Sequence, residues 1–500
     1  MAEKTAHQYI LLPPRGLSAG DVVPLTSGVS SFFTSLETVR KATAPARALS
    51  AEKIKTKMRV IDSIHENGAK LVEMSPESVS DLQAEQPGLR IVPVVYYYPA
   101  KAPRPMPSAT PKAAAAALKI SLTVVSKANR KPITAAKVVA FTNFANRTGA
   151  QGTTNKEGIA SLALGSASKK VERLYVYSGN GFWNVLEENI TLKSGMKVEM
   201  LPIDLSFTDC LRHFYGGSAA TAGQGVTVGV IDTGVGPHHD LTVTDGQNTV
   251  VGEDPAEWSD NGEGHGTHVA GIIAAHGTPP NGIGGIAPGV TLRSYRVFGK
   301  GAEGASNFSI AKAIDRAVSD GCDLINMSLG GGSRDEATHS AIADARAKGA
   351  LVIVAAGNDG RQPVSFPAAD SLSLAVSALG RQGTFPDGTT ELGDVAPPFG
   401  KDKKNFIAAF SNIGPELVLT GPGVGIISTF PGDKYAVLDG TSMACPAVTG
   451  AAAKLLSTQP ALLGNPRDQT RSDTMAKVVL QAANTLGFPA TLEGQGLIPI

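Results

Sequence analysis

The second half of the chain alternates short apolar runs with amphipathic segments of helical length. The apolar runs are typical of strands buried on both faces of a parallel sheet. The amphipathic segments place their apolar residues at helical spacing, so that one face can pack against that sheet. The expected strands are Val226–Ile231, Thr291–Phe298, Cys322–Ser328 and Leu351–Ala356, and the expected helices are Asn307–Ser319, Asp335–Lys348 and one that begins at His265. This order predicts an α/β fold in which helices cover both faces of a parallel sheet.

The first hundred residues predict another order: strand, helix, strand, strand, helix, strand. The second helix is expected after Ser75, a good N-cap residue, with Pro76 at the first helical position. The other elements are expected at Gln8–Leu12, Val29–Lys41, Met58–Ile64, Ala69–Met74 and Leu89–Tyr98. This βαββαβ order predicts a ferredoxin-like domain over residues 1–98.

A stretch rich in proline and alanine, residues 99–117, predicts an extended and semi-rigid linker. Residues 118–205 then carry short apolar or alternating runs separated by polar turn clusters, which is typical of a small β-sandwich. Its expected strands are Ile120–Val125, Ala136–Phe141, Ile159–Leu164, Val171–Ser178 and Met196–Leu201. The segment resembles immunoglobulin-like or carboxypeptidase-regulatory-like modules, and residues 206–500 remain for the α/β domain.

Composition narrows the possible partners. The 500 residues have a formal net charge of +1, so no basic surface favours nucleic acid or an anionic membrane as a partner. Three scattered cysteines are too few for a disulfide framework. No signal-peptide core and no membrane-spanning stretch is seen, so we expect action inside the cell or export by a signal absent from this chain.

Three short strings carry side chains that could act together in catalysis. Asp232 follows the strand Val226–Ile231, so its carboxylate should leave the sheet at the edge where α/β proteins build their sites. His265 opens a helix, and Ser442 precedes an alanine-rich helical run, which puts its hydroxyl at a positive helix end. A serine nucleophile needs a base that takes its proton and an acid that orients the base. Asp232, His265 and Ser442 fit these three roles.

A developing oxyanion needs a second hydrogen-bond donor besides one backbone N–H. The apolar run Leu351–Ala356 leads to Gly357 and then to Asn358, whose carboxamide is the candidate donor. Each of these strings taken alone would more often be a turn, a packed histidine or a helix cap. Their joint occurrence, on suitable elements and in the order Asp, His, Ser, favours catalysis.

The pair His265 and His268 also raises the alternative of a zinc site. Gly266 and Thr267 stand between them, so the general-base glutamate of a zincin helix is missing, and no third ligand is evident. We therefore expect His268 to be a packed structural residue and catalysis to require no cofactor.

These strings resemble the subtilisin-like serine proteases, the subtilases, from about Gly225 to the C-terminus. Supporting strings are Gly285–Pro288, Ile325–Gly331, Ala408–Pro415 and Gly494–Ile498. The resemblance implies a subtilisin-like catalytic domain over 206–500, with Asp232, His265 and Ser442 as the triad and Asn358 in the oxyanion hole. It further implies that Ser328, Leu329 and Gly330, together with Gly299 and Gly301, pair with an extended polypeptide substrate.

The family resemblance also suggests a structural calcium ion. Asp240 and Asn281 resemble residues that flank a calcium site of the family. The loop Asn281–Gly285 is trimmed where two further carbonyl ligands would be expected. Because calcium requires about six to eight oxygen ligands, the site is incomplete as far as the sequence shows.

Residues 1–98, upstream of such a catalytic domain, resemble the inhibitor-type propeptide of subtilases. The chain would then be a serine endopeptidase that acts through an acyl-enzyme and is made as a zymogen inhibited by its own N-terminal domain. Two layouts are open: the linker from Pro99 lets this domain reach over the sandwich, or Leu201–Cys210 threads the active site. Two other functions compete: an occluded regulatory protein that binds through its β-sandwich, and a narrow processing protease for one partner.

Overall fold

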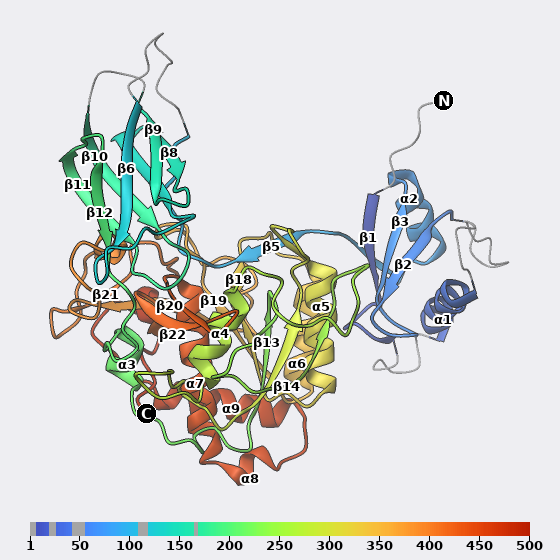
Figure 1. Ribbon diagram of the computed structural model, residues 1–500. Coiled ribbons are helices and arrows are strands. Elements are labelled where there is room, and N and C mark those ends of the chain that lie inside the picture. The colour runs from blue at the N-terminus through green and yellow to red at the C-terminus, as the bar shows by residue number, and fades with distance from the viewer. Residues whose placement is uncertain (1–6, 20–26, 43–55, 109–118, 165–168) are drawn as a thin grey trace, which may run out of the picture.

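Three units make up the molecule in the computed structural model, which describes residues 7–19, 27–42, 56–108, 119–164 and 169–500. The N-terminal unit and the β-sandwich stand at opposite ends of the large C-terminal unit, and β5 (Tyr96–Pro99) runs across that unit between them (Figure 1). In the described ranges, no helix combines the length and the apolar character that crossing a membrane requires.

The C-terminal unit is built on one eight-stranded sheet. Its strand order is β14-β15-β13-β17-β19-β20-β21, and β22 also pairs with β20. All these pairings are parallel except that of β20 with β21. The strands are β13 Thr227–Asp232, β14 Val243–Asn248, β15 Thr291–Arg296, β17 Leu324–Met327, β19 Leu351–Ala355, β20 Leu374–Arg381, β21 Asn405–Ile407 and β22 Leu417–Pro422.

Helices cover both faces of this sheet, as the sequence predicts. Along β19, Ile353 faces a core shared with α4 (His265–Ala274) and α7 (Thr441–Ser457), whereas Val352 and Val354 face a second core under α5 (Asn307–Ser319) and α6 (Glu336–Ala347). Successive side chains of a strand point to opposite faces, so a continuous apolar run serves both cores. The remaining helices are α3 Cys210–Tyr215, α8 Pro460–Leu463, α9 Gln469–Ala482, α10 Ala490–Glu493 and a 3₁₀ helix over Thr390–Asp394.

Several strands of this unit carry no clear apolar signal in the sequence. The edge strand β14 is largely polar, and the sequence did not predict it. The two-residue strands β16 (Ala305–Ser306) and β18 (Leu329–Gly330) exist only because each pairs with β5. A separate hairpin joins β23 (Ile426–Phe430) to β24 (Lys434–Leu438).

The N-terminal unit is an antiparallel sheet of order β2-β3-β1-β4, as a βαββαβ chain requires. One face carries the helices, where Leu11 packs with Phe33 and Leu82. The opposite face, which includes Ile10 and Leu71, shares a core with α5 and α6 of the C-terminal unit. The elements are β1 His7–Leu12, α1 Ser27–Ala42, β2 Arg59–Ser63, β3 Lys70–Met74, α2 Pro76–Glu85 and β4 Arg90–Pro93.

The single strand expected over Leu89–Tyr98 was wrong, because two strands occupy this stretch. β4 ends at Pro93, whose ring nitrogen cannot donate a hydrogen bond to the sheet. The chain then leaves the N-terminal sheet: the Val95 N–H donates to Asn307 Oδ1 at 3.2 Å. From Tyr96 onward it pairs with the C-terminal unit as β5.

The sandwich has a four-stranded sheet, β11-β10-β7-β8, and a three-stranded sheet, β12-β6-β9. The five expected strands are present, and β8 and β11 were missed. β8 contains Gly149 and Gly152 and lacks an apolar alternation, so only its pairing with β7 reveals it. The strands are β6 Lys119–Ser126, β7 Lys137–Asn143, β8 Thr148–Thr153, β9 Ile159–Ala163, β10 Lys170–Tyr177, β11 Val185–Thr191 and β12 Met196–Met200.

The sandwich is docked against the C-terminal unit. Trp183 is 1% exposed and belongs to the main core of that unit. Nearby, the Leu186 N–H donates to the Gly388 carbonyl at 2.9 Å, and the Gly181 N–H donates to the Tyr435 carbonyl at 2.8 Å. A buried tryptophan and backbone hydrogen bonds therefore fix this module.

The C-terminal helix α9 is tied to the sheet by a buried ion pair. Arg471, 2% exposed, lies 2.7 Å from the Asp323 carboxylate just before β17. Arg467, which is 34% exposed and 2.8 Å from the same carboxylate, remains as a second partner, so we expect Arg471→Met to lower the free energy of unfolding by about 1.5–3 kcal/mol. Urea unfolding in a Ser442→Ala background, followed by tryptophan fluorescence, measures this. The matched control is Asp473→Asn, which breaks the exposed Arg346–Asp473 pair and should change stability little. Equal losses in both variants would contradict the expectation.

Candidate active site

Asp232 and His265 form a buried hydrogen-bonded pair at the carboxyl end of β13. His265 Nδ1 lies 2.7 Å from Asp232 Oδ1, and both side chains are fully buried. The same carboxylate oxygen accepts the Thr233 N–H at 2.7 Å. His265 Nε2 is buried and has no hydrogen-bond partner in the described part of the protein. The imidazole is thus oriented at one nitrogen, and its other nitrogen is left for a further group.

Asp260, which the sequence did not single out, shapes the loop that delivers His265. Its carboxylate accepts the N–H groups of Gly262 and Gly264 and the hydroxyl of Thr267. Burial raises the pKa of Asp260, and the neighbouring Asp232 carboxylate adds to the rise. The string Asp260-Asn261-Gly262 was a visible turn signal that could have indicated this role.

Space beside the histidine depends on a glycine. Gly264 has φ +77° at the N-cap of α4, in the left-handed region that glycine favours. A Cβ atom there would collide with the ring of Phe430. A residue with a side chain at position 264 would therefore disturb the start of the helix that carries His265.

Ser442 is the second residue of α7, at the N-terminal end of a buried helix. Its hydroxyl donates to the Ser328 carbonyl at 3.0 Å, and the Ser328 hydroxyl donates back to the Ser442 carbonyl at 2.9 Å. The structure therefore joins Asp232 to His265 directly, and it leaves the Ser442 hydroxyl bonded to the neighbouring strand end.

A segment of the chain's own N-terminal part lies in the cleft. β5 is antiparallel to β16 on one side, where Tyr97 is opposite Ala305. It is also antiparallel to β18 on the other side, where Tyr98 is opposite Gly330. The Ala100 N–H then donates to the Ser328 carbonyl at 3.0 Å. Residues 96–100 thus form the middle strand of a three-stranded sheet, in the manner of an extended peptide that adds to strand edges.

The Ala100 carbonyl oxygen lies between two donors at the start of α7. The Ser442 N–H donates to it at 3.2 Å, and the Asn358 carboxamide nitrogen donates to it as well. Asn358 is oriented by its other atom, since Oδ1 accepts the Thr441 N–H at 2.9 Å. Gly440 has φ +147°, and a Cβ there would lie 2.7 Å from the Ala100 oxygen. The structure therefore brings Ser442 and Asn358 together around one peptide carbonyl.

Tyr97 fills a closed pocket beside β18. The side chain is fully buried, and its hydroxyl donates to the Ser333 carbonyl at 2.9 Å and to the Asp335 carboxylate. Gly332 forms the wall, since a Cβ there would overlap the tyrosine ring. An aromatic side chain three residues before Ala100 is thus recognised by shape and by its hydroxyl group.

The expected substrate-contacting residues fall into two groups. Ser328, Leu329 and Gly330 contact the cleft segment through backbone hydrogen bonds. Gly299 and Gly301 have no pairing with β5 in the structure, and Ala305 and Ser306 take that position. The turn at residues 299–304 is anchored elsewhere, for Glu253 accepts the Lys300 N–H at 3.0 Å. The sequence did not indicate that Ala305 and Ser306, a few positions later, would be the residues that pair with β5.

The second proposed layout is excluded, because Leu201–Cys210 does not lie in the cleft. The Leu201 carbonyl accepts the Trp183 N–H at 2.9 Å, and Asp209 caps α3 while accepting the Ile427 N–H at 2.8 Å. This stretch is a structural connection between the sandwich and the C-terminal unit.

His268 is a packed structural residue, as expected. Its Nε2 atom lies 3.1 Å from the Ile426 carbonyl and 3.2 Å from the Ala436 carbonyl, which ties α4 to the β23–β24 hairpin. Burial lowers the pKa of His268 to about 3, so the ring is neutral. All three cysteines are buried and unpaired, and burial raises the pKa of each thiol.

Asp240 and Asn281 lie near each other, but the surrounding donors do not fit calcium. Asp240 Oδ2 accepts the Ile283 N–H at 2.9 Å and the Tyr435 hydroxyl at 2.8 Å. The same hydroxyl lies 3.4 Å from the Asn281 carbonyl. A calcium ion needs several oxygen ligands, and here an N–H and an O–H group occupy Oδ2, while Oδ1 lies 3.4 Å from His239 Nε2. The calcium ion that the family resemblance suggests is therefore not favoured by the contacts of Asp240, and metal removal tests it.

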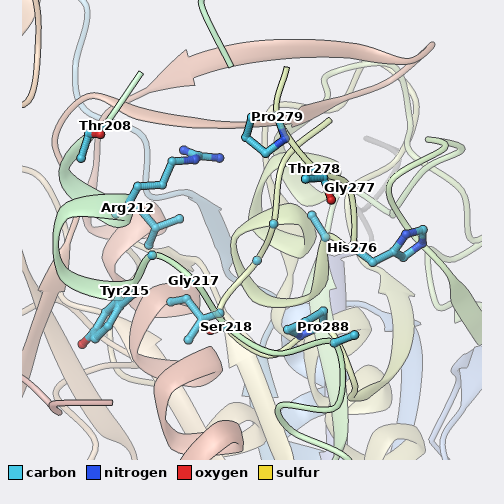
Figure 2. A pocket seen from close by; sticks show the side chains of 17 residues that line it. Thr208, Arg212, Tyr215, Gly217, Ser218, His276, Gly277, Thr278, Pro279 and Pro288 are labelled. Atoms are coloured by element: carbon cyan, nitrogen blue, oxygen red, sulfur yellow. The ribbon is translucent and has the colours of Figure 1, made fainter. Parts of the chain in front are cut away.

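A separate hollow of about 530 Å³ lies beside α3 and the loop that follows α4. Figure 2 shows Arg212 extending from α3, with His276, Thr278 and Pro279 across from it. None of the expected site residues lines this hollow. The candidate chemistry therefore belongs to the cleft that holds Ala100.

A parallel α/β sheet that presents a carboxylate–imidazole pair, and a serine whose N–H holds a peptide carbonyl, defines a serine peptidase. The family model for the subtilase family matches residues 223–497, and the chain belongs to that family. It is 38% identical over 245 residues to subtilisin DY of Bacillus licheniformis, covering 48% of this chain and 80% of that protein. It is also 38% identical over 240 residues to subtilisin BL of Lederbergia lenta, covering 48% of this chain and 78% of that one.

A thermostable alkaline protease of Halalkalibacterium halodurans is 37% identical over 278 residues, which is 55% of this chain and 66% of that protein. The α/β fold and these relatives agree on the activity. The chain is a serine endopeptidase, and its substrates are polypeptides.

The contacts of Asp240 generate an expectation about metal removal. Because N–H and O–H donors occupy Oδ2 of this carboxylate, dialysis against EDTA should leave the thermal unfolding midpoint of the Ser442→Ala protein unchanged. The Asp240→Asn variant distinguishes calcium binding at Asp240 from calcium binding elsewhere in the protein. A rise in the midpoint on adding calcium that disappears in Asp240→Asn would contradict the expectation.

Proposed function

We propose that the enzyme cleaves peptide bonds through an acyl-enzyme on Ser442, and that it is made as a zymogen whose cleft is filled by its own residues 96–100. The observation that carries the proposal is the position of the Ala100 carbonyl, which accepts from both the Ser442 N–H and Asn358. That placement is what a substrate carbonyl needs before attack.

Each triad residue has a defined task. The Ser442 hydroxyl turns from the Ser328 carbonyl and attacks the Ala100 carbonyl carbon, while His265 Nε2 takes its proton. Asp232 keeps the Nδ1 proton in place and stabilises the imidazolium. The tetrahedral intermediate collapses as His265 returns the proton to the Lys101 nitrogen, which releases the new N-terminus. Water then repeats the sequence on the ester and frees Ser442.

Two contacts support Ala100–Lys101 as the bond that is cleaved. The Ala102 N–H donates to the Asp439 carbonyl at 2.9 Å, so the chain is held on both sides of the bond. Lys101 Nζ lies 3.2 Å from Glu263, two residues before His265. The bond therefore passes between the start of α7 and the start of α4.

Inhibition follows from the same contacts together with the docking of the N-terminal unit. Its sheet buries Ile10 and Leu71 against α5 and α6, which keeps β5 at a high effective concentration at the cleft. Added polar contacts fix its orientation, such as Lys312 with Asp62 at 2.6 Å and Arg90 with Ser340 at 3.0 Å. A substrate that shares the cleft must displace this whole arrangement.

Ser442→Ala tests both parts of the proposal. The wild-type chain should yield a fragment that begins at Lys101, and the variant should remain intact because its nucleophile is gone. N-terminal sequencing and intact mass at successive times measure this. The thermal midpoint of the variant, compared with that of freshly purified wild-type protein, checks that the fold is kept. Maturation of the variant at the wild-type rate would rule the proposal out.

A permanently occluded regulatory protein is the rival. Fluorophosphonate labelling distinguishes the two, since it reports a reactive serine without needing a substrate. We expect weak labelling of Ser442 in the intact chain and strong labelling after cleavage before Lys101 and removal of residues 1–100. Absence of labelling after that removal favours the rival.

Asn358→Ala removes one of the two donors to the carbonyl oxygen. We expect the first-order rate of self-cleavage at Ala100–Lys101 to fall by about 10²–10³, because the donor stabilises charge that develops in the transition state. The measurement is the rate of appearance of the Lys101 N-terminus under dilute conditions. An unchanged thermal midpoint shows that the fold is intact. A rate within about threefold of the wild type would exclude the oxyanion role of this side chain.

A further inference from the structure

Beyond Ala100 the cleft continues into a hollow of about 600 Å³ between the sandwich and the C-terminal unit. The chain itself runs along it, since Lys101 to Pro105 line the hollow. Tyr175 and Tyr177 of β10 contribute one wall, and Asp394 and Asp439 contribute to the other. This side of the cleft would receive the part of a substrate that leaves with the amine.

The register of the chain through this hollow is fixed. The Ala102 N–H donates to the Asp439 carbonyl at 2.9 Å, and the Ala100 carbonyl is held as described above. Pro103 and Pro105 restrict the backbone on both sides of the next side chain. Arg104 therefore occupies a defined place, the fourth residue after the Ala100 carbonyl.

The Arg104 guanidinium lies over the Tyr177 ring, 4.8 Å from its centroid. Tyr177 in turn stacks on Tyr175, with ring centroids 5.9 Å apart and planes within 7°. A cation over an aromatic face is attracted by the ring electrons. The sandwich thus presents a rigid aromatic platform to a cationic side chain.

Two carboxyl groups of the C-terminal unit, Asp394 and Asp439, line the hollow together with this platform, and the charge of Asp439 also acts on the buried Glu391. Burial raises the pKa of Glu391 to about 8 and that of Asp394 as well, and Asp439 contributes to both rises. Burial raises the pKa of Asp439 to only about 6, with the Arg104 charge opposing the rise. Asp439 lines the same hollow as Arg104, and the two opposite charges attract each other, so Asp439 is the acidic side chain that the hollow offers to this cation. Glu391 Oε2 is buried and has no hydrogen-bond partner in the described ranges.

The other arginines of the hollow do not lie over Tyr177, although Arg173 donates to the Tyr175 hydroxyl at 3.1 Å. Arg147 and Arg173 both lie over the ring of Phe144, at 4.2 and 3.9 Å from its centroid. Arg173 is also 3.3 Å from Glu188. The place between Tyr177 and Asp439 is therefore held by Arg104 alone among the cations that line the hollow.

We infer that this hollow is a substrate subsite for a basic side chain, arginine or lysine, at the fourth residue after the cleaved bond. Tyr177 of the β-sandwich supplies its aromatic wall, and Asp439 supplies its negative charge. The inference rests on the proposed function, because it takes residues 96–105 as a bound substrate. It assigns the sandwich a part in choosing substrates.

Self-cleavage in the full chain gives the first test. Arg104→Lys should keep the rate of cleavage at Ala100–Lys101 within about threefold, and Arg104→Gln should lower it by about tenfold. Asp439→Asn, which keeps an acceptor for the Gly425 N–H, should lower the rate similarly. The double variant Arg104→Gln/Asp439→Asn should be no slower than either single variant. Additive losses would overturn the coupling between these two residues.

Cleavage of added peptides gives the second test. It shows whether a basic side chain is recognised as part of a substrate, which a purely structural role of Arg104 would not produce. The enzyme is the self-processed Arg104→Gln chain from which residues 1–100 have been removed, so that β5 does not block the cleft and the chain's own arm places no cation in the subsite. The substrates are quenched fluorescent peptides with the sequence of residues 96–105 and arginine, lysine, glutamine or glutamate at the fourth position after the bond. We expect kcat/KM to be about tenfold higher for arginine than for glutamine, and lowest for glutamate.

Adding the Asp439→Asn substitution to this enzyme should reduce the ratio of kcat/KM for the arginine peptide to that for the glutamine peptide to about twofold or less. The matched control is Asp387→Asn, an exposed carboxylate on a nearby loop, which should leave the ratio unchanged. Equal kcat/KM values for arginine and glutamine would overturn the subsite, even if Arg104→Gln slows self-cleavage. Absence of any cleavage between Ala100 and Lys101 in the wild-type chain would instead show that the proposed function has failed.

Discussion

The carbonyl group of Ala100 is held at the N-terminus of α7 by one backbone N–H and one carboxamide, and the arrangement of the other units follows from that contact. It fixes the register of β5 between β16 and β18. Because β4 and β5 are separated by only two residues, it also brings the N-terminal sheet onto α5 and α6. On the other side it directs the chain past Asp439 toward the sandwich. The Ala100 contact thus lies where the chain passes from one unit to the next, and the shared apolar cores hold the units around it.

The site also requires neighbouring parts of the chain to approach closely at two positions where a side chain would not fit. Glycines at positions 264 and 440 stand where a Cβ would strike Phe430 or crowd the Ala100 oxygen. Both adopt positive φ angles, which glycine tolerates at little cost. Burial then strengthens the hydrogen bond between Asp232 and His265, since competing water is excluded. The close packing that requires glycine at these two positions therefore also excludes water from the Asp232–His265 hydrogen bond.

The sandwich is more than an appended module in this arrangement. Trp183 anchors it in the core of the C-terminal unit, and β10 turns two stacked tyrosines toward the continuation of the cleft. Cleavage after Ala100 would leave it attached to the catalytic unit, because the covalent link through Met200 and Asp209 is unaffected. The aromatic wall beside the cleft would therefore persist in the mature enzyme.

Apolar periodicity and short motifs are local signals, so they were enough to predict the α/β fold, the βαββαβ order of the N-terminal unit, and Asp232, His265, Ser442 and Asn358 as candidate residues. It could not show that Leu89–Tyr98 divides at Pro93, nor that Ala305 and Ser306, in place of Gly299 and Gly301, pair with β5. β16 and β18 are two residues long and become strands only when a partner strand is present. The segment that fills the cleft could be identified only from the three-dimensional arrangement, since its place depends on backbone hydrogen bonds between residues more than two hundred positions apart.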